Sequence, residues 1–389
     1  MTEQPLVPLF DLDLDDRDVE AVAATLRSGW LTMGPQIDGF EQAFAEHLGV
    51  KHAVAVSSCT AALHLAYLAA GVGPGDEVIV PAITFVATAA AVRYCGAEPV
   101  LADIVGGRDA GIDPERVEEL IGPRTKAVCA VHYAGYPAAL TVLEEICERH
   151  GLHLIEDAAH SPSALESPGG RRLGTVGLAG AFSFFSNKVL SCGEGGLLAT
   201  EDDTVAELAR SLRSHALTTG TWDRHKGHAL GYDVVGTGFN YRMDEPRAAL
   251  LASRLGRLED EIAARRAHTH AYRAELAEVD GVECLYEDSD VELSSCYVMP
   301  LVLGDRADQA PLREALKERW NVQTSVLYPA IHEFTAYRDV RSGPLPRSEE
   351  FARTQVAVPL FPGLEDADRD RVVRGLREGL AELAGARGG

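Results

Sequence analysis

The 389-residue sequence shows no segment with the features of a secretory signal peptide or of a membrane helix. Its start, MTEQPLVPLFDLDLDD, has neither the basic residues nor the apolar stretch of a secretory signal peptide. No stretch reaches the roughly 18 uninterrupted apolar residues that are typical of a membrane helix. We therefore expect a cytoplasmic protein with no membrane contact.

Several common site motifs are also missing. The seven cysteines are scattered and form no C-x-x-C pair, which predicts reduced thiols and no metal site. No G-x-G-x-x-G follows the first strand-like run, which argues against a dehydrogenase. P-loop, H-E-x-x-H and G-x-S-x-G patterns are absent, which argues against the commonest nucleotide-binding, zinc-protease and hydrolase sites.

Positive charge is scarce. The chain has 36 Lys and Arg against 59 Asp and Glu, a formal net charge of −23. Because the phosphate backbone of a nucleic acid repels such a surface, we expect no nucleic-acid partner. The net charge does not exclude a phosphorylated small molecule as a ligand, since a single pocket can carry positive charge on a protein that is negative as a whole.

What the sequence does contain is the composition and the pattern of an α/β enzyme. It is 46% hydrophobic and 24% charged, and its length predicts two domains. Strand-like apolar runs alternate with helix-like patterns and predict a mixed, mainly parallel sheet covered by helices on both faces. The strand-like runs are 52–57, 77–81, 99–104, 126–132, 152–157, 180–185 and 196–200, and the helix-like patterns are 60–70, 85–95 and 140–150.

This large domain is predicted to span 16–245. A long helical pattern over 244–279, with allowance for a kink, leads into a smaller C-terminal α+β domain, 246–389. Its expected elements are a strand at 296–303, a helix at 309–319 and a last helix after residue 366. Residues 1–15 are predicted to pack with this smaller domain.

Reactive side chains follow the strand-like runs, where ligands gather in open α/β sheets. Asp157 ends one run, Lys188 follows another, and a turn with Ser58 and Thr60 opens a helix. An aspartate can hold a pyridine nitrogen protonated, a desolvated lysine can form an imine, and a helix N-terminus can bind phosphate. Singly, each has a plainer explanation as a helix cap, a surface charge or a helix start. Their combination within one sheet favours a pyridoxal phosphate pocket.

Seven segments make a family resemblance specific. They are SSCTAALHLA, GDEVIVPAITFVATA, VCAVHYAGYPA, LIEDAAHSPSA, FSFFSNK, GEGGLL and GFNYRMDEPRAAL. In this order, they resemble the DegT/DnrJ/EryC1/StrS family of sugar aminotransferases, and the resemblance runs from about residue 8 to 362. It implies the aspartate-aminotransferase fold, which is fold type I of the enzymes that use pyridoxal 5'-phosphate.

The resemblance also implies residue roles. Lys188 matches the lysine that forms the Schiff base and moves the proton, Asp157 the partner of the ring nitrogen, and His160 a residue beside the phenolic oxygen. Phe85 matches the aromatic residue that stacks on the pyridine ring. The matched phosphate contacts are Ser58, Thr60, Ala61, Ser183 and Asn240.

Asn240 matches a residue that reaches the phosphate of the neighbouring subunit, which implies a homodimer with shared active sites. One departure from the family pattern is Cys59, where many relatives have glycine. A cysteine there removes access to positive φ, and we interpret it as a small residue at a helix start.

For the substrate, the resemblance implies glutamate as the amino donor and a nucleotide-linked keto sugar as the acceptor. SGWLTMGP, SSCTA, VHYAGYP and EDAAH look most like the branch that acts at C4, since the C3 branch more often reads EDAAQ. We therefore expect a nucleotide-4-keto-6-deoxyhexose, in line with deoxyaminosugar and antibiotic biosynthesis. Candidates for the sugar pocket are Trp30, Thr32, Tyr328 and His332; packing or surface roles are equally compatible with these residues.

Other functions stay open at this point. A cyclitol (inosose) aminotransferase or a 3-keto-sugar aminotransferase shares the fold and the cofactor residues. A noncatalytic cofactor-binding protein would bind the cofactor and show no half-reaction. A 3-dehydratase of the family uses histidine in place of the Schiff-base lysine, and Lys188 argues against it.

Overall fold

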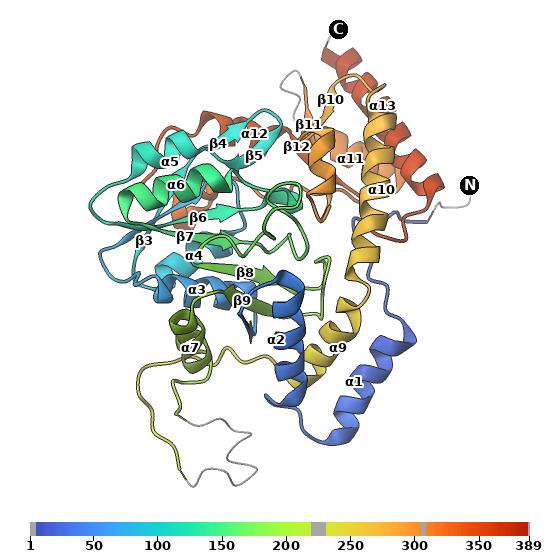
Figure 1. Ribbon diagram of the computed structural model, residues 1–389. Coiled ribbons are helices and arrows are strands. Elements are labelled where there is room, and N and C mark those ends of the chain that lie inside the picture. The colour runs from blue at the N-terminus through green and yellow to red at the C-terminus, as the bar shows by residue number, and fades with distance from the viewer. Residues whose placement is uncertain (1–4, 219–230, 305–308, 388–389) are drawn as a thin grey trace.

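A computed structural model describes residues 5–218, 231–304 and 309–387. A seven-stranded sheet with helices on both sides forms the larger part, and a small three-stranded sheet with its helices lies beside it (Figure 1). This architecture agrees with the predicted α/β fold, in which a mixed, mainly parallel sheet is accompanied by a smaller α+β unit.

The large sheet has the strand order β1-β9-β8-β7-β6-β2-β3. Its strands are β1 (His52–Val56), β2 (Glu77–Pro81), β3 (Glu98–Ala102), β6 (Thr125–Val131), β7 (His153–Asp157), β8 (Ala179–Ser183) and β9 (Gly196–Thr200). Strand β9 is antiparallel to both its neighbours, and every other pair is parallel. Consequently β1 runs in the same direction as β8, and the carboxyl ends of β1, β2, β7 and β8 lie at one edge.

Helices bury both faces of this sheet (Figure 1). One face carries α3 (Cys59–Ala69), α4 (Val86–Tyr94) and α7 (Asp203–Leu212), and the other α2 (Pro35–Leu48), α5 (Pro114–Leu120) and α6 (Leu140–His150). All five residues of β2 and of β9 are buried. This explains why these strands read as continuous apolar runs without alternation.

The smaller part is built on the antiparallel sheet β10-β11-β12. Its elements are β10 (Val282–Cys284), β11 (Met299–Leu303), β12 (Gln355–Val358), α11 (Gln309–Trp320) and α13 (Asp366–Arg387). Helices α11 and α13 pack together over an apolar core that includes Leu312, Leu316 and Leu376. Val7 forms a bridge with Val322, which joins the N-terminal segment to this part. The division into domains at residue 245 stays a prediction.

The kink allowed for within 244–279 is a complete break. Helix α9 (Glu245–Leu255) ends before Gly256, and α10 (Leu258–Leu276) starts after Arg257. Arg257 has φ −120° and ψ 6°, outside the helical range, and its guanidinium pairs with Asp18 of α1 (Asp16–Ser28). A tertiary contact therefore holds the break.

The structure also contains helices and strands that the sequence patterns did not indicate. They are helices α1, α2, α5 and α7, strands β10 and β12, strands β4 (Ile104–Gly106) and β5 (Asp109–Ile112), helix α12 (Pro346–Thr354), and four 3₁₀ turns, η1 (Tyr133–Gly135), η2 (Asp288–Glu292), η3 (Ile331–Glu333) and η4 (Thr335–Tyr337). All seven cysteines are free thiols. Within the described ranges, no helix is long and apolar enough to cross a membrane, and no group of three or more His, Cys, Asp or Glu is arranged to hold a metal ion.

Candidate active site

A cavity of about 470 Å³ opens at the edge where the parallel strands end. Its volume lies in the usual range for small-ligand sites, roughly 300–1,000 Å³. Loops that follow four strands of the large sheet line one side, and the smaller part contributes the other. The lining from the large sheet includes Ser58, Cys59, Thr60, Thr84, Phe85, Asp157, His160, Ser183 and Lys188, and that from the smaller part Tyr297, Val298, Ser325, Leu327 and Tyr328.

Lys188 lies on the loop that follows β8, with its amine inside the cavity. Its backbone N–H donates to the carbonyl of Phe185, and its Nζ lies 4.5 Å from the ring centroid of Tyr297. Burial lowers the pKa of this amine to about 8, although Cys59 and Asp157 nearby act to raise it. Near pH 8 about half of the amine is therefore neutral and nucleophilic.

Asp157 is buried at the end of β7, and hydrogen-bond donors hold its carboxylate. Thr88 Oγ1 donates to Oδ2 over 2.8 Å, and the backbone N–H of Ala159 donates to Oδ1 over 3.2 Å. Thr84 Oγ1 lies 2.8 Å from Thr88 Oγ1. Because the Thr88 proton goes to the carboxylate, the Thr84 hydroxyl is the donor in that pair. Burial raises the pKa of Asp157, while these donors and Lys188 favour its charged form.

The start of α3 forms a cradle for an anion. Ser58 caps the helix, and its Oγ accepts a hydrogen bond of 3.2 Å from the N–H of Ala61. The N–H groups of the first helical turn have no partner within the helix and favour a negative ligand. Thr60 and Ser183 add hydroxyl groups to the cavity. Ala61 lies outside the cavity lining, and the cap already uses its N–H.

Phe85 forms a flat apolar wall of the cavity. It stands at the N-cap of α4, the residue is 54% exposed, and its ring centroid lies 5.8 Å from that of Tyr328. An aromatic ring so placed can stack on the face of a planar ligand.

His160 is held in one tautomer. Its Nδ1 accepts from the backbone N–H of Ala134 over 3.2 Å, so Nδ1 carries no proton. Burial lowers the pKa of the ring well below its usual value, so the ring is neutral and its proton lies on Nε2. Nε2 lies 2.7 Å from the hydroxyl of Tyr328 and donates to that oxygen. The O–H of Tyr328 is then free to donate to a ligand in the cavity.

The other residues predicted from the sequence lie outside this cavity. Trp30 donates from Nε1 to the carbonyl of Met33, and Thr32 lies in the same connection between α1 and α2. His332 Nε2 lies 3.4 Å from Glu349. Asn240 is exposed and forms a bridge with Ser214. Of the four sugar-pocket candidates, Tyr328 alone lines the cavity of its own chain.

The sequence interpretation missed three residues that contact the central groups. Thr84 and Thr88 support Asp157, and Tyr297 lies under the amine of Lys188 and stacks on His160, with ring centroids 4.3 Å apart. The two threonines were a usable signal, since they flank the start of α4 just after a strand: Thr84 precedes the N-cap Phe85, and Thr88 lies in the first turn. No local pattern marks Tyr297.

A pyridoxal phosphate molecule fits the residues present. The cavity provides an amine with a lowered pKa, a carboxylate held by donors, a helix N-terminus with hydroxyl groups, and a flat aromatic wall. These groups come from one edge of the sheet, so a single planar anionic ligand can contact all of them.

Comparison with known proteins agrees with this geometry. Residues 12–377 match the DegT/DnrJ/EryC1/StrS aminotransferase family. The chain is 34% identical over 368 residues to the spore coat polysaccharide biosynthesis protein SpsC of Bacillus subtilis, covering 93% of this chain and 94% of SpsC.

Two solved structures are similar along nearly their whole length and confirm the predicted aspartate-aminotransferase-like fold. S. venezuelae DesV, in complex with a ketimine intermediate, is 36% identical with a TM-score of 0.87, covering 96% of this chain and 98% of DesV. DesI in the presence of its TDP-sugar product is 32% identical with a TM-score of 0.85, covering 99% of this chain and 96% of DesI. The chain thus belongs to the DegT/DnrJ/EryC1/StrS aminotransferase family, and it is a sugar aminotransferase that depends on pyridoxal 5'-phosphate.

Proposed function

We propose that this enzyme moves an amino group from glutamate to a nucleotide-linked 4-keto-6-deoxyhexose, in two half-reactions at one site. The observation that carries the amino-transfer chemistry is the cavity shared by the amine of Lys188 and the buried carboxylate of Asp157. The nucleotide sugar is supported by the TDP-sugar product present with DesI and by the C4-branch segments of the sequence.

The cofactor supplies an aldehyde for the amino group and a ring that accepts electron density. With the cofactor bound, Lys188 would hold its aldehyde through the neutral amine, and the same amine, when released, would take up and return a proton at Nζ. The carboxylate of Asp157 would keep the ring nitrogen protonated, and Phe85 would lie against the face of the ring. Neutral His160 donates a hydrogen bond, which leaves the hydroxyl of Tyr328 directed to a ligand.

Phosphate binding is assigned to the start of α3 together with Ser183 and with Asn240 of a second copy of the chain. Asn240 supports this sharing because it is exposed and lies outside the cavity of its own chain. The proposal therefore includes a homodimer in which each subunit completes the other's site. Trp30, Thr32 and His332 stay candidates for contacts with the sugar, since they too lie outside their own chain's cavity.

An absorbance experiment tests the donor half-reaction. Purified enzyme with bound cofactor is expected to show a visible band that L-glutamate converts into a near-ultraviolet band. A nucleotide-4-keto-6-deoxyhexose should then restore the visible band. If a 3-keto sugar or an inosose restores it and the 4-keto sugar does not, the acceptor is wrong; if glutamate leaves the band unchanged, the donor is wrong.

The pKa of Lys188 predicts how fast the protein without cofactor takes it up at different pH values. The amine must be neutral to attack the aldehyde, and its pKa is lowered from 10.5 to about 8. The neutral fraction therefore rises about fivefold from pH 7 to pH 8 and levels off above about pH 9. Stopped-flow recording of the visible band should follow this curve. A rate that keeps rising tenfold per pH unit beyond pH 9 would contradict it.

A further inference from the structure

A second cavity, of about 280 Å³, adjoins the first. The two share Phe10, Asn187 and Lys188 in their linings. The second lies where the N-terminal segment, the loop after β8, the α9–α10 junction and the turn at 361–363 meet. Its charged lining residues are Lys188, Arg254, Arg257, Arg265, Asp11, Asp13 and Glu261.

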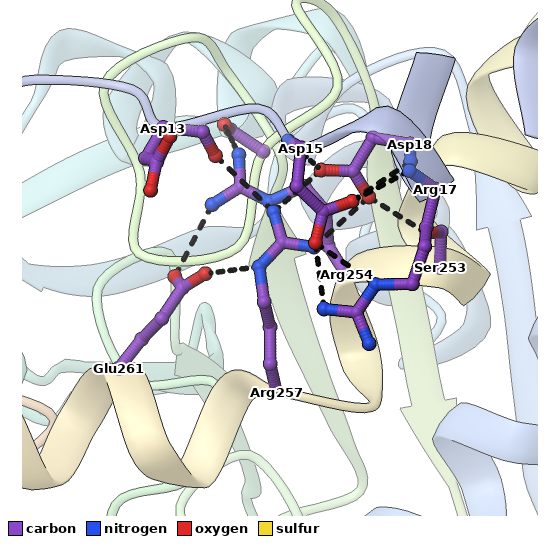
Figure 2. Close-up of polar contacts among 9 residues, drawn as sticks. Asp13, Asp15, Arg17, Asp18, Ser253, Arg254, Arg257 and Glu261 are labelled. Atoms are coloured by element: carbon purple, nitrogen blue, oxygen red, sulfur yellow. Dashed lines mark hydrogen bonds and ion pairs between the residues drawn. The ribbon is translucent and has the colours of Figure 1, made fainter. Parts of the chain in front are cut away.

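Two of the three arginines already have carboxylate partners. Figure 2 shows Glu261 between Arg254 and Arg257, with Asp18 on the far side of Arg257. Arg257 Nε lies 2.8 Å from Glu261 and its Nη2 2.5 Å from Asp18, and Arg254 Nη2 lies 3.2 Å from Glu261. The carboxylates of the chain itself therefore balance these two cations.

Arg265 differs from both. It lies on α10 with 3% of its surface exposed, and it forms no ion pair with any described carboxylate. Its Nη1 donates to the carbonyls of Tyr297 and Leu360 over 3.2 and 2.9 Å, and to that of Cys296 over 3.5 Å. Its Nε is buried with no partner among the described residues, and its Nη2 makes no hydrogen bond there either.

A buried cation without a counter-ion is unfavourable, and this lowers the pKa of the group. Burial lowers the pKa of Arg265 to about 10, so the group stays charged at neutral pH. Unpartnered buried donors are uncommon in folded proteins and call for a ligand or a water. Nε and Nη2 form the edge of a guanidinium that binds a carboxylate through two parallel hydrogen bonds.

The position of Arg265 relates it to the reacting amine. Tyr297 contacts both groups: its ring lies 4.5 Å from Lys188 Nζ, and its carbonyl accepts from Arg265 Nη1. Because Lys188 lines both cavities, a substrate whose amino nitrogen takes the place of Lys188 Nζ can extend into the second cavity. Asp11 and Asp13 are exposed in the lining, which disfavours a highly charged phosphate more than a single carboxylate.

We propose that Arg265 binds the side-chain carboxylate of the amino donor in this second cavity and so makes the enzyme selective for a dicarboxylic amino acid. The inference rests on the proposed donor half-reaction and adds the residue that recognises the donor.

Donor selectivity tests the proposal. Conversion of the visible band is followed in the holoenzyme with L-glutamate and with its neutral isostere L-glutamine. Arg265→Met is expected to lower kcat/KM for glutamate about 10- to 100-fold and to leave that for glutamine within about threefold, since a hydrogen bond to a charged group is lost for one donor alone. The matched control is Arg266→Met. Arg266 lies on the same helix and donates to the Ser294 carbonyl, but it does not line the cavity.

A binding measurement gives a readout independent of turnover. Calorimetry with the holoenzyme should show that glutarate binds more tightly than butyrate, and Arg265→Met should remove the difference. If the variant loses glutamate and glutamine activity equally, Arg265 has only a structural role through its hydrogen bonds to backbone carbonyls, and the proposal is wrong.

If Arg265→Met does not fold, Arg265→Lys decides. It keeps a cation but loses the two-donor edge, so the ratio of glutamate to glutamine activity must fall; an unchanged ratio overturns the proposal. If the wild-type band responds to neither donor, the donor half-reaction fails, and tighter binding of glutarate than of butyrate would still support a carboxylate site at Arg265.

Discussion

Replacing Lys188 by alanine is expected to abolish turnover, with a loss of at least about 10³-fold, since a positioned proton-transfer group alone contributes roughly 10²–10⁴-fold. No other lysine lines the cavity, so no described side chain can substitute for its amine. The variant should still bind the cofactor, because the α3 cradle and Asp157 are unchanged, but its visible band should be lost.

The measurements are the rate of the glutamate half-reaction and mass spectrometry after borohydride reduction, which should label Lys188 in the wild type and no residue in the variant. Lys51→Ala is a suitable control, because Lys51 is exposed and lies 3.6 Å from Asp203, away from the cavity. Normal turnover by Lys188→Ala would remove the basis of the proposed function.

The second large effect is expected from Asp157→Asn. The amide keeps the size of the side chain, but its single oxygen can replace only one of the two carboxylate oxygens, which accept separately from Thr88 and from Ala159. Its NH₂ group would then face the ring nitrogen of the cofactor as a donor, which disfavours the protonated ring. We expect the rate of the donor half-reaction to fall by about 100-fold, because a hydrogen bond to a charged group is worth roughly 1.5–3 kcal/mol.

Single-turnover kinetics measures this loss, and a cofactor titration of the same variant separates chemistry from binding. The control is Asp203→Asn, which removes an exposed carboxylate that pairs with Lys51 and His52. A half-reaction rate equal to the wild type would show that the carboxylate does not act on the ring.

Much of the large sheet could be predicted from the sequence because its strands are buried on both faces. The run at 77–81 coincides with β2, and the run at 196–200 with β9. The small sheet gave weaker signals: β10 has three residues and β12 four, too few for a period to show. The break at Gly256 and Arg257 was also beyond local patterns, since Asp18, which holds it, lies 239 residues away in the sequence.

In the site, too, the residues that follow the strands of the large sheet could be predicted, and those that depend on contacts between distant segments could not. Lys188, Asp157 and the α3 turn follow strands and lie together because parallel strands end at one edge. Tyr297 and Arg265 belong to the smaller part, and their contacts with the lysine and with carbonyls depend on how that part packs on the sheet. Arg265 differs from the other arginines of the cavity because it is buried without a counter-ion, and the spacing of residues in the sequence does not reveal this property.

The contact between Asp18 and Arg257 also sets an order of events during protein synthesis. Helix α1 packs against α9, and Asp18 pairs with Arg257 at the far end of that helix. At about 5–20 residues per second, the ribosome adds the 239 residues between them in roughly 12 to 48 s. During that time α1 has emerged without its partner, and Val19 and Leu26, which stay exposed even in the folded chain, face the surrounding solvent together with the rest of the helix. The first helix to leave the ribosome thus reaches its final packing only after its partner at Arg257 has been made, and chaperone contact with α1 is expected during this interval.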